Sequence, residues 1–249
     1  MVYCHRIRFT AQREEEGALL VSAPIERILW LVVLALVASY AAGTWLNRRR
    51  SKAIGSWLQS GLAAWGGKLT WRWLRSMSSG AEITLADPPR PFRNVRANYF
   101  MMTREIMPLW GIERLRGKRD TLAVRADLRD PPRYNIEVVP LDGELRRTLD
   151  LHPPEVGSGA EVRTEPWEWR EGPAGLGLAT HGEGNDAIIA AAEAFTGRYG
   201  VYIQRLSLRD RQPHLVLFAA LDGLEHMDAM EFTQALRRFA TSGVSGQKK

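Results

Sequence analysis

Residues 28–46 read ILWLVVLALVASYAAGTWL, and Asn47-Arg48-Arg49-Arg50 follow them directly. As a helix, this uncharged run is about 28 Å long, which is close to the hydrocarbon thickness of a bilayer. Trp30 and Trp45 lie near its two ends, where indole rings prefer the level of the lipid headgroups. We therefore predict a single transmembrane helix over residues 28–46.

Two other interpretations of this run are less favoured. A buried core helix seldom stays uncharged for so long and then meets three arginines, and a cleaved signal peptide has a shorter apolar region, of about 7 to 15 residues. Arg48, Arg49, Arg50 and Lys52 outweigh Arg27 beside the membrane, so the positive-inside rule predicts a cytosolic carboxyl-terminal part. Residues 1–27 then form a short lumenal or exterior segment.

Composition excludes several classes of protein. The chain has 249 residues, of which 45% are hydrophobic and 9% aromatic, so it can bury a core and is not a disordered tail. Cys4 is its single cysteine, which excludes an intramolecular disulfide and a thiolate-rich metal site. The net charge of +6 is uneven, because residues 47–119 carry 15 basic and 4 acidic side chains, whereas residues 120–249 carry 15 and 20. The +11 segment beside the predicted membrane helix suggests a polyanionic partner.

A tryptophan-rich apolar stripe follows the membrane helix. Its members recur at helical spacing over residues 51–76: Ile54, Trp57, Leu58, Leu62, Trp65, Leu69 and Trp73. We predict a basic juxtamembrane amphipathic helix within residues 47–80, weakened or kinked at Gly66-Gly67. The stripe either packs on the following domain or lies in the membrane interface.

The rest of the chain predicts a cytosolic α/β (α+β) domain made of two similar β-α-β-β-α halves. The halves are residues 81–151 and 165–241, with a linker over 152–164 and a tail over 242–249. The first half has strands at 83–85, 95–106, 121–128 and 134–139, the last two as a hairpin, and helices at 109–115 and 142–151. The second has strands at 167–169, 201–208 and 215–221, the last two as a pair, and helices at 187–198 and 224–240, with Asp186 as a helix cap.

No catalytic residues, cofactor site or metal site are predicted. His181 and His226 are the only histidines in a suggestive context. A glycine-rich loop explains His181 better than catalysis does, and for His226 the better explanation is a helix start at which Asp228 interacts with free backbone amides. No two-histidine metal spacing, dinucleotide motif or phosphate loop occurs. A membrane-tethered hydrolase using His181 or His226 is therefore the least favoured function.

The basic segment supplies the candidate contact residues instead. We predict that eight side chains contact a polyanion, either ribosomal RNA or lipid headgroups: Arg48, Arg49, Arg50, Lys52, Arg114, Arg116, Lys118 and Arg119. No interleaved aromatic signature of base-specific RNA recognition is present, so sequence-specific reading is not expected.

Several stretches together resemble a known family. They are the single uncharged span, the basic stretch at 47–58, Asn98-Tyr99-Phe100 through Ile112-Glu113-Arg114-Leu115, the strand at 121–128, and Leu215-Val216-Leu217-Phe218 followed by residues 224–228. Over residues 40–239, the chain is similar to the calumin-like PAT complex subunit family, coiled-coil-containing membrane proteins of the endoplasmic reticulum.

The resemblance implies a non-enzymatic intramembrane chaperone or scaffold that is associated with the translocon. Such proteins pair with the small membrane protein Asterix, bind the Sec translocation channel and the ribosome, and shield polar transmembrane segments of nascent multipass membrane proteins. A helper is needed because polar groups of a client helix are costly to leave in lipid before their partners arrive. The sequence lacks the family's acidic lumenal region and lysine-rich coiled coil, so calcium binding and part of the ribosome contact do not carry over.

The second functional hypothesis is a membrane-anchored lipid-binding or tethering module. In that case the tryptophan stripe of residues 54–73 lies on the bilayer, and membrane lipids are the partner.

Overall fold

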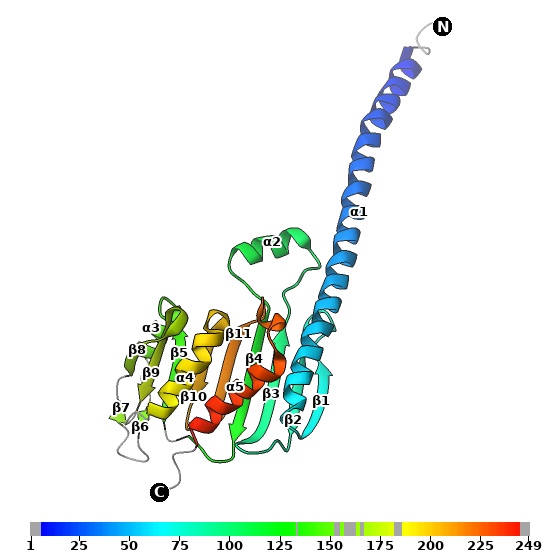
Figure 1. The fold of residues 1–249 in the computed structure, drawn as a ribbon. Coiled ribbons are helices and arrows are strands. Elements are labelled where there is room, and N and C mark those ends of the chain that lie inside the picture. The colour runs from blue at the N-terminus through cyan, green and yellow to red at the C-terminus, as the bar shows by residue number, and fades with distance from the viewer. Residues whose placement is uncertain are drawn as a thin grey trace.

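A long helix leaves one end of an open sheet (Figure 1). The structure is a computed structural model, which describes residues 6–132, 134–151, 155–156, 163–164, 167–181 and 186–244; side chains are described from Ile25 onward, those of residues 150–164 excepted. Helix α1 (Arg6–Ala63) extends away from the sheet at its amino-terminal end, and its last turns lie beside α5 (Ala229–Ser242) on one face. Helix α4 (Asp186–Tyr199) lies beyond α5 on the same face.

Helix α1 changes its surroundings along its length. From Ile25 to Leu46 its large apolar side chains are exposed, and the segment Ile25–Ala63 includes a stretch that is long and apolar enough to cross a membrane. This agrees with the transmembrane helix predicted for residues 28–46, which is called the span below. Beyond the span the same helix enters the folded domain without a break.

The predicted juxtamembrane helix ends earlier than expected. Gly66 and Gly67 adopt positive φ angles of 74° and 105°, which favour glycine, and the helix stops at Ala63 instead of continuing with a kink. Leu69 and Trp73 therefore lie on strand β1 (Lys68–Trp73), so the prediction of helix beyond Ala63 was wrong.

The apolar stripe of α1 packs on the domain. Ile54, Leu58 and Leu62 are buried, and the Trp65 ring stacks on Phe92 with centroids 4.7 Å apart. Trp57 packs on Phe232 of α5 and donates a hydrogen bond of 2.7 Å to the backbone oxygen of Met227. The packing interpretation is confirmed for these residues, and the interpretation that the stripe lies on a bilayer was wrong.

Within the described residues, nine strands form one antiparallel sheet in the order β1-β2-β3-β4-β11-β10-β5-β9-β8. Their bounds are β2 (Gly80–Ala86), β3 (Phe92–Phe100), β4 (Thr121–Leu128), β5 (Asn135–Pro140), β8 (Glu168–Glu171), β9 (Leu176–His181), β10 (Ile203–Leu208) and β11 (Leu215–Ala220). The remaining elements are α2 (Met107–Leu115), α3 (Glu144–Leu151), the short pair β6 (Glu155–Val156) and β7 (Arg163–Thr164), and three 3₁₀ turns, η1 (Pro173–Gly175), η2 (Gly200–Tyr202) and η3 (Leu224–His226).

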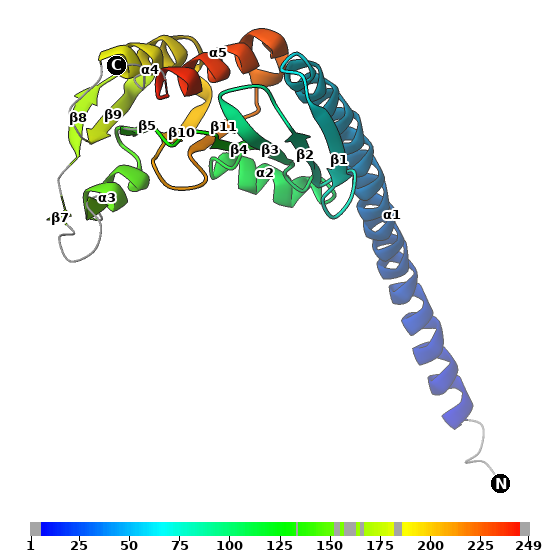
Figure 2. The same ribbon diagram turned by 90° about the horizontal axis from the view of Figure 1, so that it is seen from below.

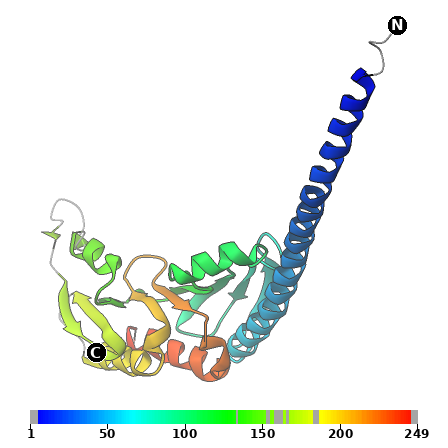
Figure 3. The ribbon, with the colours of Figure 1, turned by 90° about the horizontal axis from the view of Figure 1, so that it is seen from above.

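The core lies between the sheet and the layer formed by α1, α5 and α4 (Figure 2). Successive strand residues point to opposite faces, so alternate positions such as Leu122 and Val124 of β4, and Leu215 and Leu217 of β11, are buried under the helices. Figure 3 shows α2 near the edge of the sheet from which the span leaves, on the side away from α4 and α5.

Strands β4 and β5 are not the predicted hairpin. β4 pairs with β3 and β11, whereas β5 pairs with β10 and β9. Strands were nevertheless predicted at the positions of β4 and β5. The predicted pairing of the strands at 201–208 and 215–221 is confirmed by β10 and β11. The strands of residues 81–151 and 165–241 interleave in one sheet, however, so the two halves are not separate units.

Close packing of α1 on α5 depends on Gly61. A Cβ atom at this position would lie 2.6 Å from the backbone oxygen of Ala229, whereas a Cβ at Gly111 of α2 would meet no atom within 4 Å. We expect Gly61→Ala to destabilise the protein by about 1–3 kcal/mol because the two helices must separate. Gly111→Ala should be neutral or stabilise by up to about 1 kcal/mol through helix propensity. Urea unfolding in detergent, followed by tryptophan fluorescence, compares them; equal midpoints would contradict close packing at Gly61.

His214 makes stability depend on pH. Burial lowers its pKa below the ordinary value, although Asp127 and Asp210 oppose this, and its Nδ1 accepts a hydrogen bond of 2.9 Å from the Leu128 amide. Below about pH 6.5 the unfolded chain therefore takes up a proton that the folded chain resists, and stability falls as the pH drops. We expect His214→Asn, which keeps an acceptor, to lose less unfolding free energy between pH 7 and pH 5 than the wild type. An equal loss in both proteins would assign the pH dependence to other groups.

Candidate functional site

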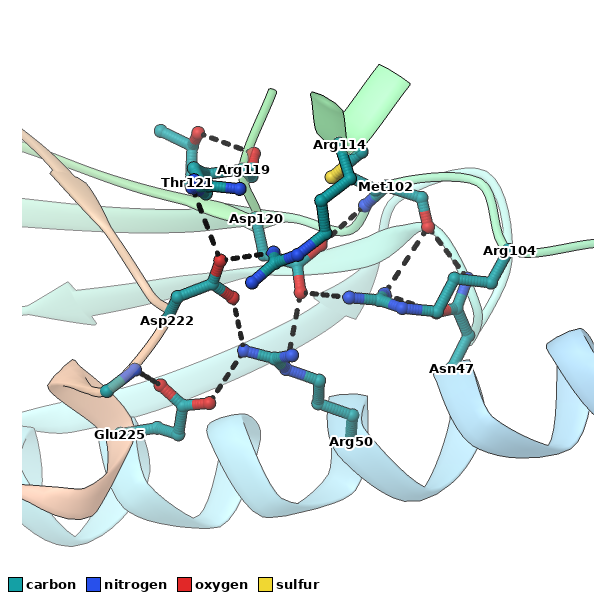
Figure 4. A network of polar contacts seen from close by, with 11 residues as sticks. Asn47, Arg50, Met102, Arg104, Arg114, Arg119, Asp120, Thr121, Asp222 and Glu225 are labelled. Carbon is teal, nitrogen blue, oxygen red and sulfur yellow. Dashed lines mark hydrogen bonds and ion pairs between the residues drawn. The ribbon is translucent and has the colours of Figure 1, made fainter. Parts of the chain in front are cut away.

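Polar side chains from five segments meet at the ends of strands β4 and β11 nearest the span (Figure 4). The segments are α1 just after the span, the β3–α2 connection, α2 itself, the α2–β4 connection and the turn after β11. Their members are Asn47, Arg50, Arg104, Arg114, Arg119, Asp120, Asp222 and Glu225, which are called the span-proximal network below.

Asp120 is the buried centre of this network. Its side chain is 0% exposed, and it accepts hydrogen bonds from the Met102 amide and from Nη2 of Arg104, both at 2.7 Å. Nε of Arg50 lies 3.2 Å from the same carboxylate. A carboxylate without solvent contact is costly unless cations and hydrogen bonds compensate it, and here two guanidinium groups and one backbone amide do so.

Two further carboxylates face Arg50. Nη2 of Arg50 is 2.7 Å from both Asp222 and Glu225, and Arg114 donates a hydrogen bond of 2.5 Å to Asp222. Burial would raise the pKa of Asp222, but the hydrogen bonds from Arg114 and Arg50 outweigh it and lower that pKa below the ordinary value. Arg50 therefore joins α1 to the start of β4 and to the turn after β11.

Asn47 fastens the β3–α2 connection to α1. Its amide donates a hydrogen bond of 2.9 Å to the backbone oxygen of Met102 and accepts one of 2.6 Å from Nη1 of Arg104. One turn earlier, a Cβ at Gly43 would lie only 1.8 Å from the backbone oxygen of Arg104, so only glycine lets the connection cross here. One turn later, Ser51 and Tyr99 share a hydrogen bond of 2.8 Å. Three successive turns of α1 thus contact the sheet edge.

A pocket of about 410 Å³ opens between α1 and α2. Its walls combine apolar and basic side chains: Leu46, Arg49, Arg50, Ala53, Arg104, Met107 and Trp110. The Arg104 guanidinium lies 5.7 Å from the centroid of the Trp110 ring, which is a cation–π distance.

The eight predicted contact residues divide into two groups. Arg50, Arg114 and Arg119 face carboxylates of the network, and Lys118 pairs with Glu113 at 2.5 Å, so their charges are compensated within the chain. Lys118 and Arg119 are exposed in spite of these contacts. Arg48, Arg49, Lys52 and Arg116 are exposed as well. Among the described side chains no carboxylate pairs with these four, although Arg49 contacts the Trp45 ring at 5.7 Å. These four, the exposed basic set, are the ones available to an external polyanion.

Sequence reasoning missed the carboxylates of the network and the role of Asn47. Arg50 is far along the chain from Asp120, Asp222 and Glu225. No local sequence pattern predicts that these residues are in contact. Asn47 carried a signal, since Ser39, Gly43, Asn47, Ser51 and Gly55 recur every four residues and mark one contact face of a helix.

The histidines do not assemble a catalytic or metal site in the described part of the chain. His181 lies on β9 beside Trp167, whereas His226 is exposed on η3, between β11 and α5. Asp228 caps α5 by accepting a hydrogen bond of 2.7 Å from the Glu231 amide, as its helix-start position predicted. No group of three potential metal ligands occurs among the described residues.

Comparison with known protein families finds no matching family, and comparison with curated proteins finds no relative. The resemblance to the calumin-like PAT complex subunit family therefore stays a prediction from the sequence.

Removing the charge of Asp120 tests the network. We expect Asp120→Asn to destabilise the folded domain by about 3–5 kcal/mol, because it leaves Arg104 buried without a counter-charge. Asp127→Asn is the matched control, since Asp127 on β4 accepts an exposed hydrogen bond of 2.9 Å from Asn94 and an asparagine can still accept it. The control should change stability by less than about 0.5 kcal/mol. Similar urea midpoints for the two variants would show that the network does not hold the sheet edge.

Proposed function

We propose that this chain is a single-pass scaffold of the endoplasmic reticulum membrane that assists insertion and folding of multipass membrane proteins beside the translocon. The observation that carries the proposal is the unbroken helix α1, which runs from the span into the core and is fastened to the sheet edge by the span-proximal network. A domain fastened in this way keeps a defined distance and orientation to the membrane, as a scaffold must. Its cytosolic location follows from the positive-inside rule.

The exposed basic set supports a polyanionic partner at the membrane surface. Arg48, Arg49 and Lys52 lie on α1 directly after the span, and Arg116 follows α2. Cations near an anionic surface each contribute roughly 1 kcal/mol, and RNA phosphates attract them without regard to sequence. Ribosomal RNA is the partner that the family resemblance implies, with the Sec channel, an Asterix-like protein and nascent membrane proteins as further partners.

A lipid-binding or tethering module is the second candidate. The tryptophan stripe cannot serve it, because Trp57 and Trp65 pack inside the domain. Exposed apolar side chains on α2 favour it instead.

Sedimentation with ribosome–translocon complexes tests the first candidate. We expect the detergent-solubilised protein to sediment with these complexes at low salt and to be released as salt rises. A variant with Arg48, Arg49, Lys52 and Arg116 changed to glutamine should bind more weakly and with a flatter salt dependence, because fewer phosphates are neutralised.

The control neutralises four exposed arginines outside the span-proximal network: Arg90, Arg93, Arg211 and Arg238. It lowers the net charge equally and should keep wild-type binding. Wild-type protein that stays in the light fractions at low salt would overturn the scaffold proposal, and equal weakening in both variants would overturn the role of the exposed basic set.

A further inference from the structure

We propose that α2 is an interfacial membrane helix, with one face at the boundary between headgroups and acyl chains of the leaflet that the span enters. This inference rests on the proposed membrane anchoring by the span. The occupant of the exposed α2 face is the lipid bilayer itself.

The first observation is the pattern of exposure on α2. The helix has no buried residue, and its apolar side chains Leu109, Ile112 and Leu115 are 49%, 47% and 90% exposed. They recur every three residues and therefore lie along one side of the helix. No described part of the chain covers this side. Exposure of these three apolar side chains to water would be unfavourable.

The second observation is what the opposite side of α2 does. Arg114 points towards the sheet and reaches Asp222 (Figure 4). Met107 and Trp110 line the pocket against α1. At about 100° per residue, Arg114 lies on the side of the helix away from Ile112. α2 is thus fixed to α1 and to the span-proximal network by the side that carries Met107, Trp110 and Arg114. Its other side, with Ile112, faces away from the domain.

The third observation is depth. The Met107 amide at the start of α2 donates a hydrogen bond of 3.1 Å to Oγ of Ser39, within the uncharged span. Ser39 precedes Trp45 by six residues, or about 9 Å along the helix axis. Interfacial helices bury their apolar face by about 5–10 Å, so a helix that starts level with Ser39 lies at a suitable depth when Trp45 is at the headgroups.

The fourth observation is orientation and charge. α2 lies crosswise to α1, so it runs along the membrane surface when α1 crosses it (Figure 1). Arg116, directly after α2, is exposed and can reach headgroup phosphates. An uncovered apolar side, an opposite side bound to the domain and a basic end together define an interfacial helix.

Site-directed spin labelling of the full chain in lipid nanodiscs tests the proposal. Cys4 is replaced by serine, and single cysteines are placed at Ile112, Leu115, Leu34 in the span, and Ala190 on the outer side of α4. Collision rates with oxygen, which concentrates in lipid, and with a water-soluble nickel chelate are measured for each label. We expect the oxygen-to-nickel ratio at Ile112 and Leu115 to shift from the Ala190 value towards the Leu34 value.

The outcomes separate this inference from the proposed anchoring. Labels at Ile112 and Leu115 that resemble Ala190 while Leu34 is lipid-exposed would overturn the interfacial helix and leave the anchoring intact. A Leu34 label as accessible to nickel as Ala190 would overturn the anchoring. Labels at Ile112 and Leu115 that are shielded from both reagents, or that couple magnetically between chains, would assign the α2 face to a protein contact and overturn the lipid proposal.

Discussion

The buried carboxylate of Asp120 constrains the whole span-proximal end of the molecule. Without solvent contact it needs compensation, and Arg104 and Arg50 provide this from two different segments. Arg50 extends the constraint to Asp222 and Glu225, and Asn47 and Arg104 extend it to the backbone before α2. The sheet edge, the span helix and α2 therefore hold one another in place.

This arrangement links the span to the core through a single continuous helix. The same face of α1 that carries Asn47 and Ser51 continues as Ile54, Leu58 and Leu62, so polar contacts near the span give way to apolar packing further along. No hinge separates the two parts of α1. Tilting of the domain against the span would therefore break both the ion pairs and the packing against α5, which makes the geometry suitable for a scaffold and for holding α2 at a fixed height.

Local patterns predicted much of the secondary structure. The strand at residues 121–128 and the cap at Asp228 were right because alternation and capping are local properties. The helix after the span was predicted to be too long, because Leu69 and Trp73 continue the helical spacing of apolar residues by coincidence. In the structure the helix ends before Gly66 and Gly67. The hairpin of β4 and β5 was wrong because a turn signal does not show that β11 and β10 insert between the two strands.

By itself, the sequence determined the apolar span and the excess of positive charge beside it, since each depends on residues that are close together in the chain. Only the tertiary structure decided which of those charges remain available. Arg50, Arg114 and Arg119 face carboxylates that β4 and β11 bring to the same place, whereas Arg48, Arg49, Lys52 and Arg116 are exposed and pair with no carboxylate among the described side chains. Coulomb interactions depend on distance in space, and a net charge summed along the chain contains no such distances.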